Sequence, residues 1–570
     1  MKRLVDSIVV DFPEDRYVVP TMDQGKFFKV DYTDRCLYVP PEKALRANFA
    51  LVDKFTDAVL AFSKADLTSP RDWSAVTLEE DNGVESSALA IISRLKSLIT
   101  LEKDVSYVSC DIETKRVLLR DNAVLAIGFC AGNMHADIVT VFTPAVCAAL
   151  HDLFALNRNS VHWIWHNGKF DSLRLKYFLN IDARVDEDTM LMHFVGINER
   201  RGTHRLKELG AIFCQAPHWE DQLDAIKKAT CKRLGLRQDE FTYDQFPRHL
   251  LLKYLSYDVA VGRDLYFTLL PLMRENTEFI YEKLIQASAA YRDVELRGIS
   301  LDMHYLECLE LKLERSIEVA SRILDKEVQV VWNPLRYQRE SGAKSCPKRF
   351  NMKSPAQLKW LLQTVTGQDI PNTSKEVLEE LFDDVGEDYP VINAIRDLRK
   401  LNKYMDTYVQ GLRDLVVEDG RIHGVFNLHG TETGRLSSSD PNMQNIPRDA
   451  AIKNLFVAAD GFKLVQLDYS QAELRVLAYL SKDPFLTDVY QSGDDLHDRV
   501  ATKLYGDAFT KEDRVKAKAV NFGIVYGLGP GSLSKKQKIS FSEAKTIIDA
   551  WLANAAGAKD WIQKQRNMVH

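Results

Sequence analysis

The sequence predicts a multidomain α/β protein, and three observations lead to this expectation. The chain has 570 residues, which is too long for one ordinary domain of about 100–200 residues. Hydrophobic residues make up 45% and charged residues 27%, which is the composition of a globular chain with a sizeable core. Strand-like and helix-like patterns alternate after residue 105, whereas long helical patterns dominate 283–330 and 355–417.

The charge balance, the cysteines and the hydropathy exclude several classes of protein. With 81 acidic and 75 basic residues the formal net charge is −6, so contacts with nucleic acid have to come from local basic surfaces. The eight cysteines form no Cys-x-x-Cys pair, which argues against a zinc ribbon or a disulfide framework and for a reducing compartment. The sequence contains neither a long apolar run nor a signal peptide, so we expect a soluble, cytoplasmic protein without a membrane partner.

We expect five segments along the chain, with boundaries near residues 100, 285, 420 and 490. Residues 1–100 mix strand and turn signals, with helical spacing over 42–63 and a polar run at 77–87 that is typical of a linker. Strands are expected at 105–112, 123–130 and 160–165, each bounded by Asn, Gly or Asp. The punctuated stretch 331–349 carries five basic residues against one acid and is expected to be an insertion between helices.

Four acidic residues and a tyrosine occupy positions that suit the binding of metal ions and of a water molecule. Asp111 and Glu113 end the first expected strand, and residues i and i+2 of a strand share one face. Two carboxylates on one face can hold divalent metals that act on a phosphodiester, although this pair alone is more often a solvated strand end. Asp171 follows the strand at 160–165, and Tyr254 and Asp258 stand at i and i+4 on one helix face. A tyrosine in that position could orient an attacking water.

The motifs Asp-x-Glu-Thr, Asn-x-x-Phe-Asp and Tyr-x-x-x-Asp occur in this order between residues 111 and 258. This order resembles the three motifs of the DEDDy 3′–5′ exonucleases, which have a ribonuclease H-like fold. Segments 188–191 and 202–207 match as well. The resemblance implies an active exonuclease domain over 101–285, with Asp111, Glu113, Asp171 and Asp258 as metal ligands and Tyr254 on the water.

Three further motifs lie in the C-terminal half. Residues 433–447 form a loop-like segment rich in side chains that hydrogen-bond phosphates and sugars, although an ordinary Ser/Asn-rich turn has the same composition. Residues 464–468 are expected to form an apolar strand that ends at Asp468, followed by a helix. Steps of four place two cations and two aromatic residues on one helical stripe, which suits a triphosphate and a stacked base. These residues are Arg514, Lys518, Phe522 and Tyr526. A surface helix with buried aromatic residues is the alternative.

Together the motifs resemble the family A DNA polymerases, the group of bacterial DNA polymerase I and many phage replicative enzymes. The resemblance implies a right-hand polymerase after the exonuclease domain: thumb over 286–420 with the basic insertion 331–349, palm over 421–490 and fingers over 491–570. It implies that Asp468 and the backbone carbonyl of Tyr469 bind catalytic Mg²⁺, which Mn²⁺ can replace.

The resemblance also assigns the substrate contacts. Lys518 is implied to donate a proton to pyrophosphate, and Glu473 to act as the steric gate that selects deoxynucleotides. The implied nucleotide contacts are Gln471, Glu473, His497, Arg514, Lys518, Phe522 and Tyr526. The implied contacts to primer–template DNA are Arg435, Asn442, Gln444 and Gln471.

One family element is missing from the sequence. Motif C, a His-Asp-Glu hairpin that supplies the second metal-binding carboxylate of the palm, does not occur after Tyr526. We therefore expect the C-terminal part of the palm to be absent, so that Asp468 forms only half of a two-metal site.

Three functions compete on this basis. The first is a DNA-templated DNA polymerase with 3′–5′ proofreading, of phage type, split or truncated and completed by a second polypeptide that carries motif C. The second is a 3′–5′ exonuclease with a DNA-binding remnant of a polymerase, and the third is a non-catalytic DNA-binding scaffold. The expected partners of the first are primer–template DNA, dNTPs and a processivity factor, in the cytoplasm of a bacterium or of a phage-infected host.

Overall fold

The computed structural model describes most of the chain as two compact units, Met1–Phe462 and Lys463–His570. The described residues are 5, 8, 12–65, 71–101, 104–200, 202, 204–344, 347–385, 389–537 and 539–569, and within them the side chains of residues 25, 49, 327, 383, 384, 522 and 569 are not described. Each unit is taken by itself below.

The first unit begins with a small α/β module. Its three strands are ordered β1-β3-β2, with β1 and β3 parallel and β2 and β3 antiparallel. The bounds are β1 Tyr17–Pro20, β2 Val30–Asp31, β3 Cys36–Val39, α2 Glu42–Ala47 and α3 Phe49–Lys64, with a short 3₁₀ turn at Gln24–Lys26. The helical spacing predicted for 42–63 is therefore confirmed as two helices.

A six-stranded mixed sheet follows, in the order β4-β7-β6-β5-β8-β9. The bounds are β4 Thr77–Glu80, β5 Ser106–Thr114, β6 Val124–Gly132, β7 His135–Val139, β8 Val161–Trp165 and β9 Glu187–Asp188. Strands β5, β6 and β8 confirm the three strands predicted from apolar runs. Strand β5 lies inside the sheet, antiparallel to β6 and parallel to β8.

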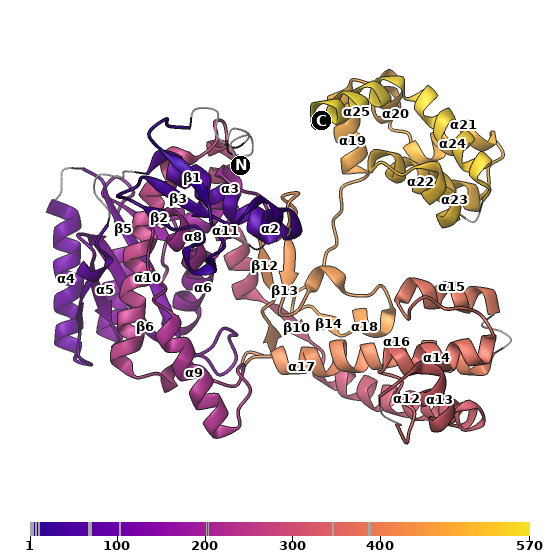
Figure 1. Cartoon of the computed structure of the whole chain (residues 1–570), viewed down its shortest axis with the longest axis horizontal. Helices are drawn as coiled ribbons and strands as arrows, with labels where there is room; N and C mark the ends of the chain where they lie inside the picture. The colour runs from indigo at the N-terminus through magenta and orange to yellow at the C-terminus, as the bar shows by residue number, and fades with distance from the viewer. Residues whose placement is uncertain are drawn as a thin grey trace. The chain divides into compact units, whose positions relative to one another are not determined.

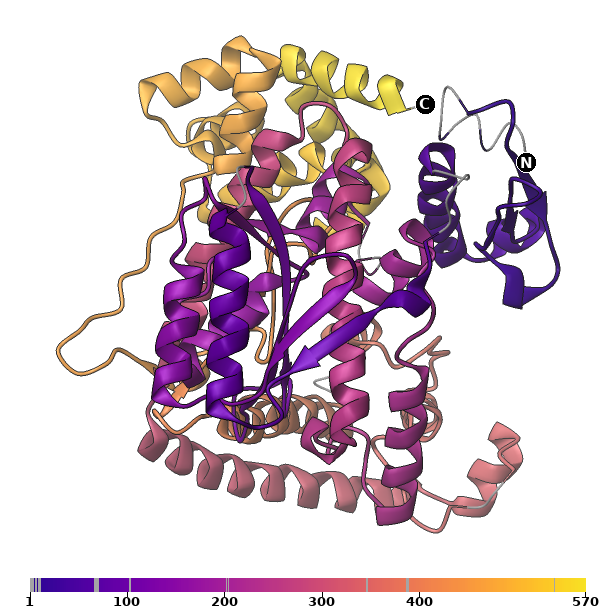
Figure 2. The same cartoon turned by 90° about the vertical axis from the view of Figure 1, so that its left-hand side faces the viewer.

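Helices cover both faces of this sheet (Figures 1 and 2). Helices α4 (Glu85–Leu101) and α5 (Pro144–Phe154) pack against each other and against the face that carries Cys110, Ile112 and Trp163. Helix α10 (Arg248–Leu269) packs on the opposite face. The other elements here are α6 Gly168–Leu179, α7 Thr189–Gly196, α8 Leu206–Phe213 and α9 Asp221–Leu234, with 3₁₀ turns at Trp73–Ala75, Tyr243–Gln245 and Leu270–Leu272.

The polar run 77–87, predicted to be a linker, is instead part of the sheet. Thr77–Glu80 form the edge strand β4, which pairs with β7, and α4 begins at Glu85. The run is polar because residues of β4 are alternately exposed and half-buried. Asp81 is fully buried after the strand and accepts hydrogen bonds from the backbone N–H groups of Gly83, Thr140 and Val141 at 3.0, 2.6 and 3.0 Å. The sheet thus begins before the boundary expected near residue 100.

Long helices follow, as predicted for 283–330 and 355–417. Their bounds are α11 Glu278–Arg297, α12 Met303–Val331, α13 Pro334–Ser341, α14 Pro355–Thr366, α15 Lys375–Val385, α16 Pro390–Lys403, η5 Tyr404–Gln410 and α17 Gly411–Leu415. The basic stretch 331–349 contains α13, and its residues 345 and 346 lie outside the described part of the chain. Short strands close the unit, in the orders β11-β10-β14 and β12-β13. They are β10 Ile299–Leu301, β11 Arg421–Ile422, β12 Val425–Asn427, β13 Ser437–Ser439 and β14 Phe456–Val457, with a 3₁₀ turn Met443–Asn445 and helix α18 Ala450–Lys453.

The second unit is helical. Its helices are α19 Ala472–Ser481, α20 Pro484–Ser492, α21 Leu496–Tyr505, α22 Lys511–Val525, α23 Pro530–Gln537, α24 Phe541–Asn554 and α25 Ala556–Val569. The strand predicted for 464–468 is wrong, because this segment has no regular secondary structure and the described residues of the second unit contain no strand with which it could pair. Leu464, Val465 and Leu467 are 62%, 78% and 89% exposed. A strand needs hydrogen bonds from a neighbouring strand, and an apolar pattern alone does not supply them.

Across the part of the chain that the structure describes, no helix is both long enough and apolar enough to span a membrane.

Removing the Asp81 carboxylate is expected to destabilise the sheet. In Asp81→Ala three backbone N–H groups lose the buried carboxylate that accepts from them, which is expected to cost about 2–4 kcal/mol of unfolding free energy. Urea unfolding followed by the fluorescence of the buried Trp163 and Trp165 measures this loss. Asp72→Ala is the control, because exposed Asp72 caps only a short 3₁₀ turn, and about 1 kcal/mol or less should be lost. Equal losses in the two variants would contradict the assigned role of Asp81.

Candidate functional site

Strand β5 and helix α10 bring three carboxylates together in the first unit. Cys110 and Ile112 face α4 and α5, so alternation along the strand turns Asp111 and Glu113 toward the face that α10 covers. Asp258 lies on α10, and one carboxylate oxygen from each of Asp111, Glu113 and Asp258 lies within 4.8 Å of the others. Glu113 and Asp258 are 5% and 4% exposed, whereas Asp111 is half-buried, so the cluster reaches the surface through Asp111.

Asp171 joins this cluster from helix α6. Its Oδ1 accepts a hydrogen bond of 3.2 Å from the backbone N–H of Ile112, between the two acids of β5. The helix begins at Gly168, where a Cβ atom would lie 2.5 Å from Cβ of Trp165, so only glycine fits there. Asp188 holds this turn, because its two carboxylate oxygens accept from the N–H groups of Asn167 and Gly168 at 3.1 and 2.9 Å.

Three of the four acids border a small cavity. A cavity of about 200 Å³ is lined by Asp111, Glu113 and Asp258, and Tyr254 lines it one helical turn before Asp258. The structure thus places four of the five predicted exonuclease residues on this cavity, and Asp171 is joined to it through its hydrogen bond to Ile112, which also lines the cavity.

Two contacts of the site were not found from the sequence. Lys207, noticed only as part of a matching segment, donates a hydrogen bond of 2.6 Å to Oδ1 of Asp258. Trp219 donates from its indole N–H to the same oxygen at 2.8 Å. The ammonium of Lys207 also lies 4.4 Å from the ring centroid of Tyr254, so this one cation contacts both residues of the last motif. No sequence signal connects Trp219 with Asp258, because they lie 39 residues apart.

Burial and mutual repulsion oppose ionisation of these acids. Burial raises the pKa of Asp111 well above its usual value, and the charges of Asp171, Asp258 and Glu113 raise it further. Burial and then Asp258 raise the pKa of Glu113 in the same way, and burial raises the pKa of Asp171 to about 7. Although burial opposes it, the pKa of Lys207 is raised by the charge of Asp258 and its neighbours. The pocket thus holds more negative charge than Lys207 compensates.

The donor set fits hard divalent cations. Mg²⁺ and Mn²⁺ prefer oxygen ligands, and the side chains whose ligand atoms converge here are the three carboxylates of Asp111, Glu113 and Asp258. A bound divalent cation would also relieve the repulsion that raises these pKa values.

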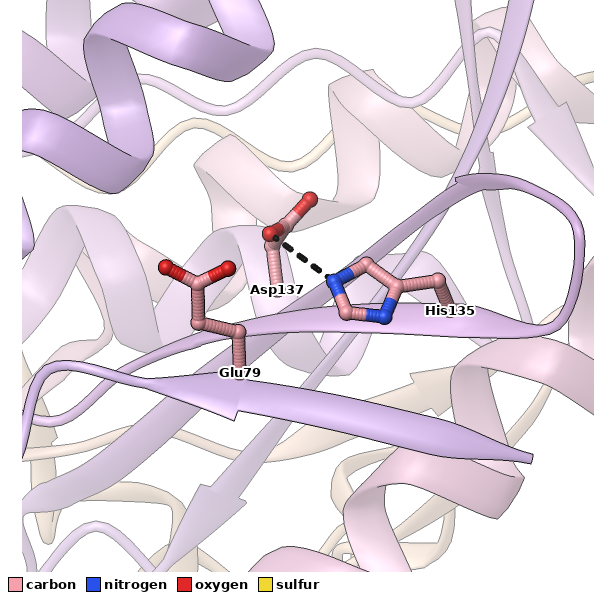
Figure 3. Close-up of side chains that lie close together, drawn as sticks. All are labelled: Glu79, His135 and Asp137. Carbon is pink, nitrogen blue, oxygen red and sulfur yellow. Dashed lines mark ion pairs between the residues drawn. The ribbon is translucent and has the colours of Figure 1, made fainter.

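A second cluster that could hold a metal, Glu79, His135 and Asp137, lies on strands β4 and β7 (Figure 3). His135 Nε2 lies 3.7 Å from Asp137, and its Nδ1 lies 3.0 Å from the hydroxyl of Thr77. Arg94 of α4 bonds to both carboxylates of the cluster, at 2.5 Å for Glu79. Because this guanidinium already supplies the positive charge, the cluster is an ion-pair network that ties α4 to the sheet edge.

The second unit holds most of the predicted nucleotide contacts around α22. Arg514 is held by the carboxylates of Asp495, at 2.9 Å, and Asp498, and Lys518 is exposed one turn further along. Tyr526, directly after the helix, donates a hydrogen bond of 2.5 Å to Glu473 of α19. Phe522 belongs to α22, but its side chain lies outside the described part of the structure.

The other predicted residues of this unit are more scattered. His497 is 4% exposed and its Nδ1 lies 2.8 Å from the side-chain nitrogen of Asn521, so its ring faces the helical core. Gln471 accepts a hydrogen bond of 3.0 Å from the hydroxyl of Tyr490. Asp468 and Tyr469 lie in an exposed segment without regular secondary structure, and Asp468 joins no acidic cluster among the described residues.

The predicted DNA contacts of the first unit lie on its surface. Arg435, Asn442 and Gln444 are exposed, in the loop before β13 and in the turn after it.

Comparisons with known proteins match two segments of the chain to two family models. Residues 89–274 match the family model described as 3′–5′ exonuclease, and residues 327–570 match the model described as DNA polymerase family A. The DNA polymerase of Escherichia phage T5 is 27% identical over 513 residues, which cover 81% of this chain and 58% of that protein. DNA polymerase I of Rhizobium leguminosarum is 31% identical over 435 residues, which cover 73% of this chain and 39% of that protein. The chain thus matches only part of the length of these relatives.

A solved structure supports the fold. The POL domain of Pol1 from M. smegmatis, in complex with DNA primer–template and dNTP, aligns with a TM-score of 0.62 at 24% identity. The alignment covers 83% of this chain and 76% of that one. The predicted mixed α/β fold class is therefore confirmed, whereas absence of the C-terminal part of the palm stays a prediction.

The stability of the metal-free protein is expected to fall as pH rises from about 5 to about 8. The raised folded-state pKa values, about 7 for Asp171, mean that the folded state holds protons which the unfolded chain has already lost near pH 4. Their stabilising effect is therefore lost as the pH passes through about 7. Mg²⁺ is expected to restore several degrees of melting temperature at about pH 8 and much less at about pH 5.

Thermal melts in EDTA and in Mg²⁺ at both pH values test this expectation. Asp111→Asn is the matched variant: it removes one buried charge and one ligand, so it should be more stable than the parent in EDTA at about pH 8 and gain less from Mg²⁺. A parent protein whose melting temperature in EDTA rises toward about pH 8 would contradict the account.

Proposed function

Since this chain belongs to the family A DNA polymerases and carries a 3′–5′ exonuclease domain, we propose that it removes nucleotides from DNA 3′ ends and takes part in DNA-templated DNA synthesis. The observation that carries the exonuclease part is the convergence of Asp111, Glu113 and Asp258 on one small cavity, with Asp171 hydrogen-bonded to the backbone between the first two. Hydrolysis at this cavity is the activity that the geometry supports best.

In the proposed exonuclease site the four acids hold Mg²⁺, which Mn²⁺ can replace. When bound there, the metal would supply the Lewis-acid chemistry that lowers the pKa of water and stabilises negative charge on the leaving 3′ oxygen of the scissile phosphodiester. Tyr254 points its ring at the same cavity as Asp111, Glu113 and Asp258, and we assign its hydroxyl to orienting the attacking water. Lys207 fixes the Asp258 carboxylate through its 2.6 Å hydrogen bond and limits the repulsion in the pocket.

In the proposed polymerase site α22 and α19 bind the incoming dNTP. Arg514, held in place by two carboxylates, and the exposed Lys518 are one turn apart and suit the phosphates of a nucleotide. We assign Lys518 to proton donation toward pyrophosphate, Phe522 and Tyr526 to the base side, and Glu473 to selection against a 2′-hydroxyl. We assign Gln471 and His497 to the remaining nucleotide contacts. Because the ring of His497 is buried, its contact requires a conformational change.

Asp468 and Tyr469 are proposed to carry catalytic Mg²⁺ for synthesis. The exposed apolar segment 464–468 suggests that further palm strands pair with it, and the second carboxylate would come with them. We propose that these strands lie outside residues 1–570, further along a longer chain or on a second polypeptide that carries motif C. Primer–template DNA would run along Arg435, Asn442, Gln444 and the helical thumb at 286–420.

The bounds of the palm and fingers and the cellular setting of the enzyme belong to the same proposal. We place the palm at 421–490 and the fingers at 491–570, with a phage-type enzyme acting in the cytoplasm of a bacterium or of its infected host. The basic residues of 331–349 would contact DNA or a processivity factor. One observation favours the narrower alternative, an exonuclease with a DNA-binding remnant: among the described residues Asp468 belongs to no group of three or more side chains that could hold a metal.

Loss of one metal ligand tests the exonuclease assignment. Asp111→Asn is expected to slow release of nucleotides from a labelled single-stranded 3′ end by about a thousandfold or more, because the two-metal site loses a ligand. Tyr254→Phe is expected to slow it about tenfold to a hundredfold. Tyr257→Phe is the matched control, since this tyrosine lies on the same helix but bonds to the carbonyl of Trp73 at 2.9 Å. Unchanged degradation by Asp111→Asn would remove the assignment.

Nucleotide binding tests the other half. Lys518→Ala is expected to weaken binding of a fluorescent dNTP about tenfold or more, because hydrogen bonds to charged groups contribute about 1.5–3 kcal/mol. Lys516→Ala, on the same helix but paired with Asp513 at 3.7 Å, should bind as the parent does. Equal affinity in both variants and the parent would argue against a triphosphate site on α22.

A further inference from the structure

Glu295 is a buried carboxylate that joins two parts of the first unit. It lies on α11 and is 4% exposed. Its Oε1 forms an ion pair with Lys169 of α6 and also accepts a hydrogen bond of 2.6 Å from the backbone N–H of Phe426 in β12. One oxygen atom thus holds a helix and a strand that are more than two hundred residues apart in the sequence.

The two segments that Glu295 joins have different proposed roles. Lys169 precedes Asp171 by two residues on the helix that brings this acid to the exonuclease pocket. Phe426 belongs to the hairpin of β12 and β13, whose loop carries Arg435. The hairpin therefore cannot shift away from α6 without breaking a charge-assisted hydrogen bond or exposing a buried ion pair.

Further contacts of α11 support this junction. The backbone carbonyl of Glu295 lies 2.6 Å from Nδ1 of His423, which therefore donates to it, and the rings of Tyr291 and Phe426 lie 5.6 Å apart. Helix α11 thus contacts the hairpin and the residues just before it through one main-chain hydrogen bond and one pair of aromatic rings.

A cavity of about 510 Å³ lies between the hairpin and the turn before α6. Asn427, His429 and Ser437 line it from the hairpin. His166 and Lys207 line both this cavity and the 200 Å³ cavity of the carboxylates, so the two spaces adjoin. Any DNA strand long enough to pass from the carboxylate pocket into the larger cavity would meet the hairpin, whereas a single nucleotide in the pocket would not.

We propose that Glu295 is a positioning residue that sets the distance between α6 and the β12–β13 hairpin, and thereby the binding of DNA strands that extend beyond the terminal nucleotide. This inference rests on the proposed exonuclease function. It assigns Glu295 no contact with DNA or metal. Its effect is expected on the Michaelis constant of long substrates and not on the hydrolytic step.

Two substrates of different length separate this role from a purely structural one. The p-nitrophenyl ester of thymidine 5′-monophosphate reaches only the carboxylate pocket, whereas a single-stranded oligonucleotide also reaches the hairpin. In Glu295→Gln the amide can keep one of the two bonds of Oε1, and its NH₂ group then faces the other donor. We expect KM for the oligonucleotide to rise about three- to tenfold, with kcat for both substrates and KM for the ester within about twofold of the parent.

Two further variants keep the test informative if Glu295→Gln is unstable. Lys169→Met combined with Glu295→Gln removes both charges and leaves the amide oxygen for the N–H of Phe426, so thermal stability should recover while KM for the oligonucleotide stays raised. Asp182→Asn is the control: it breaks the 2.8 Å ion pair of Arg292, on the same helix α11, away from the hairpin contact of Glu295. It should leave both substrates within about twofold.

The outcomes are distinct. A rise confined to the oligonucleotide supports the proposal, and an equal change for both substrates, or none for either, overturns it. Hydrolysis of neither substrate by the parent protein in Mg²⁺ or Mn²⁺ would overturn the exonuclease assignment and this inference together. Hydrolysis of the ester by the parent with an unaltered KM for oligonucleotides in Glu295→Gln would overturn the inference alone.

Discussion

The convergence of four carboxylates near the end of β5, three of them on one cavity, is the constraint on which the first unit depends. Like charges brought together away from water repel strongly, and the raised pKa values of Asp111, Glu113 and Asp171 express that cost. Lys207 compensates part of it at Asp258. The remaining negative charge destabilises the metal-free fold but favours the binding of divalent cations. The site therefore lowers the unfolding free energy of the metal-free protein and raises its affinity for metal.

The surrounding scaffold keeps these charges in place. Strand β5 lies inside the sheet: its first half pairs with β8, and Asp111 and Glu113 pair with Gly128 and Ala126 of β6, so these two acids cannot shift without disrupting the sheet. Asp188 and the glycine at 168 fix the turn that starts α6, and Asp171 is locked to the backbone of Ile112. In the second unit fewer contacts hold the predicted site residues. Arg514 bonds to Asp498 of α21 and to Asp495, the N-cap of that helix, but Asp468 lies in a segment without regular secondary structure.

Much of this architecture could be predicted from local patterns. Strands β5, β6 and β8 are apolar runs with clear ends, and the i, i+4 spacing of Tyr254 and Asp258 needed only one regular helix. Prediction failed where contacts with neighbouring elements decide the structure of a segment. The edge strand β4 is polar because half of it faces solvent, and 464–468 is apolar but has no strand beside it. The contact of Lys207 with Asp258 joins residues 51 positions apart, and no pattern in the sequence encodes it.

A time course on a 5′-labelled primer with a mispaired 3′ end, annealed to a template and incubated with the parent protein and Mg²⁺ without dNTPs, tests the central claim most directly. The account predicts a ladder of products shortened one nucleotide at a time from the 3′ end, which EDTA abolishes. An intact primer, with a protein that melts cooperatively and gains melting temperature from Mg²⁺, would contradict it: the carboxylate pocket would then bind metal without hydrolysing DNA.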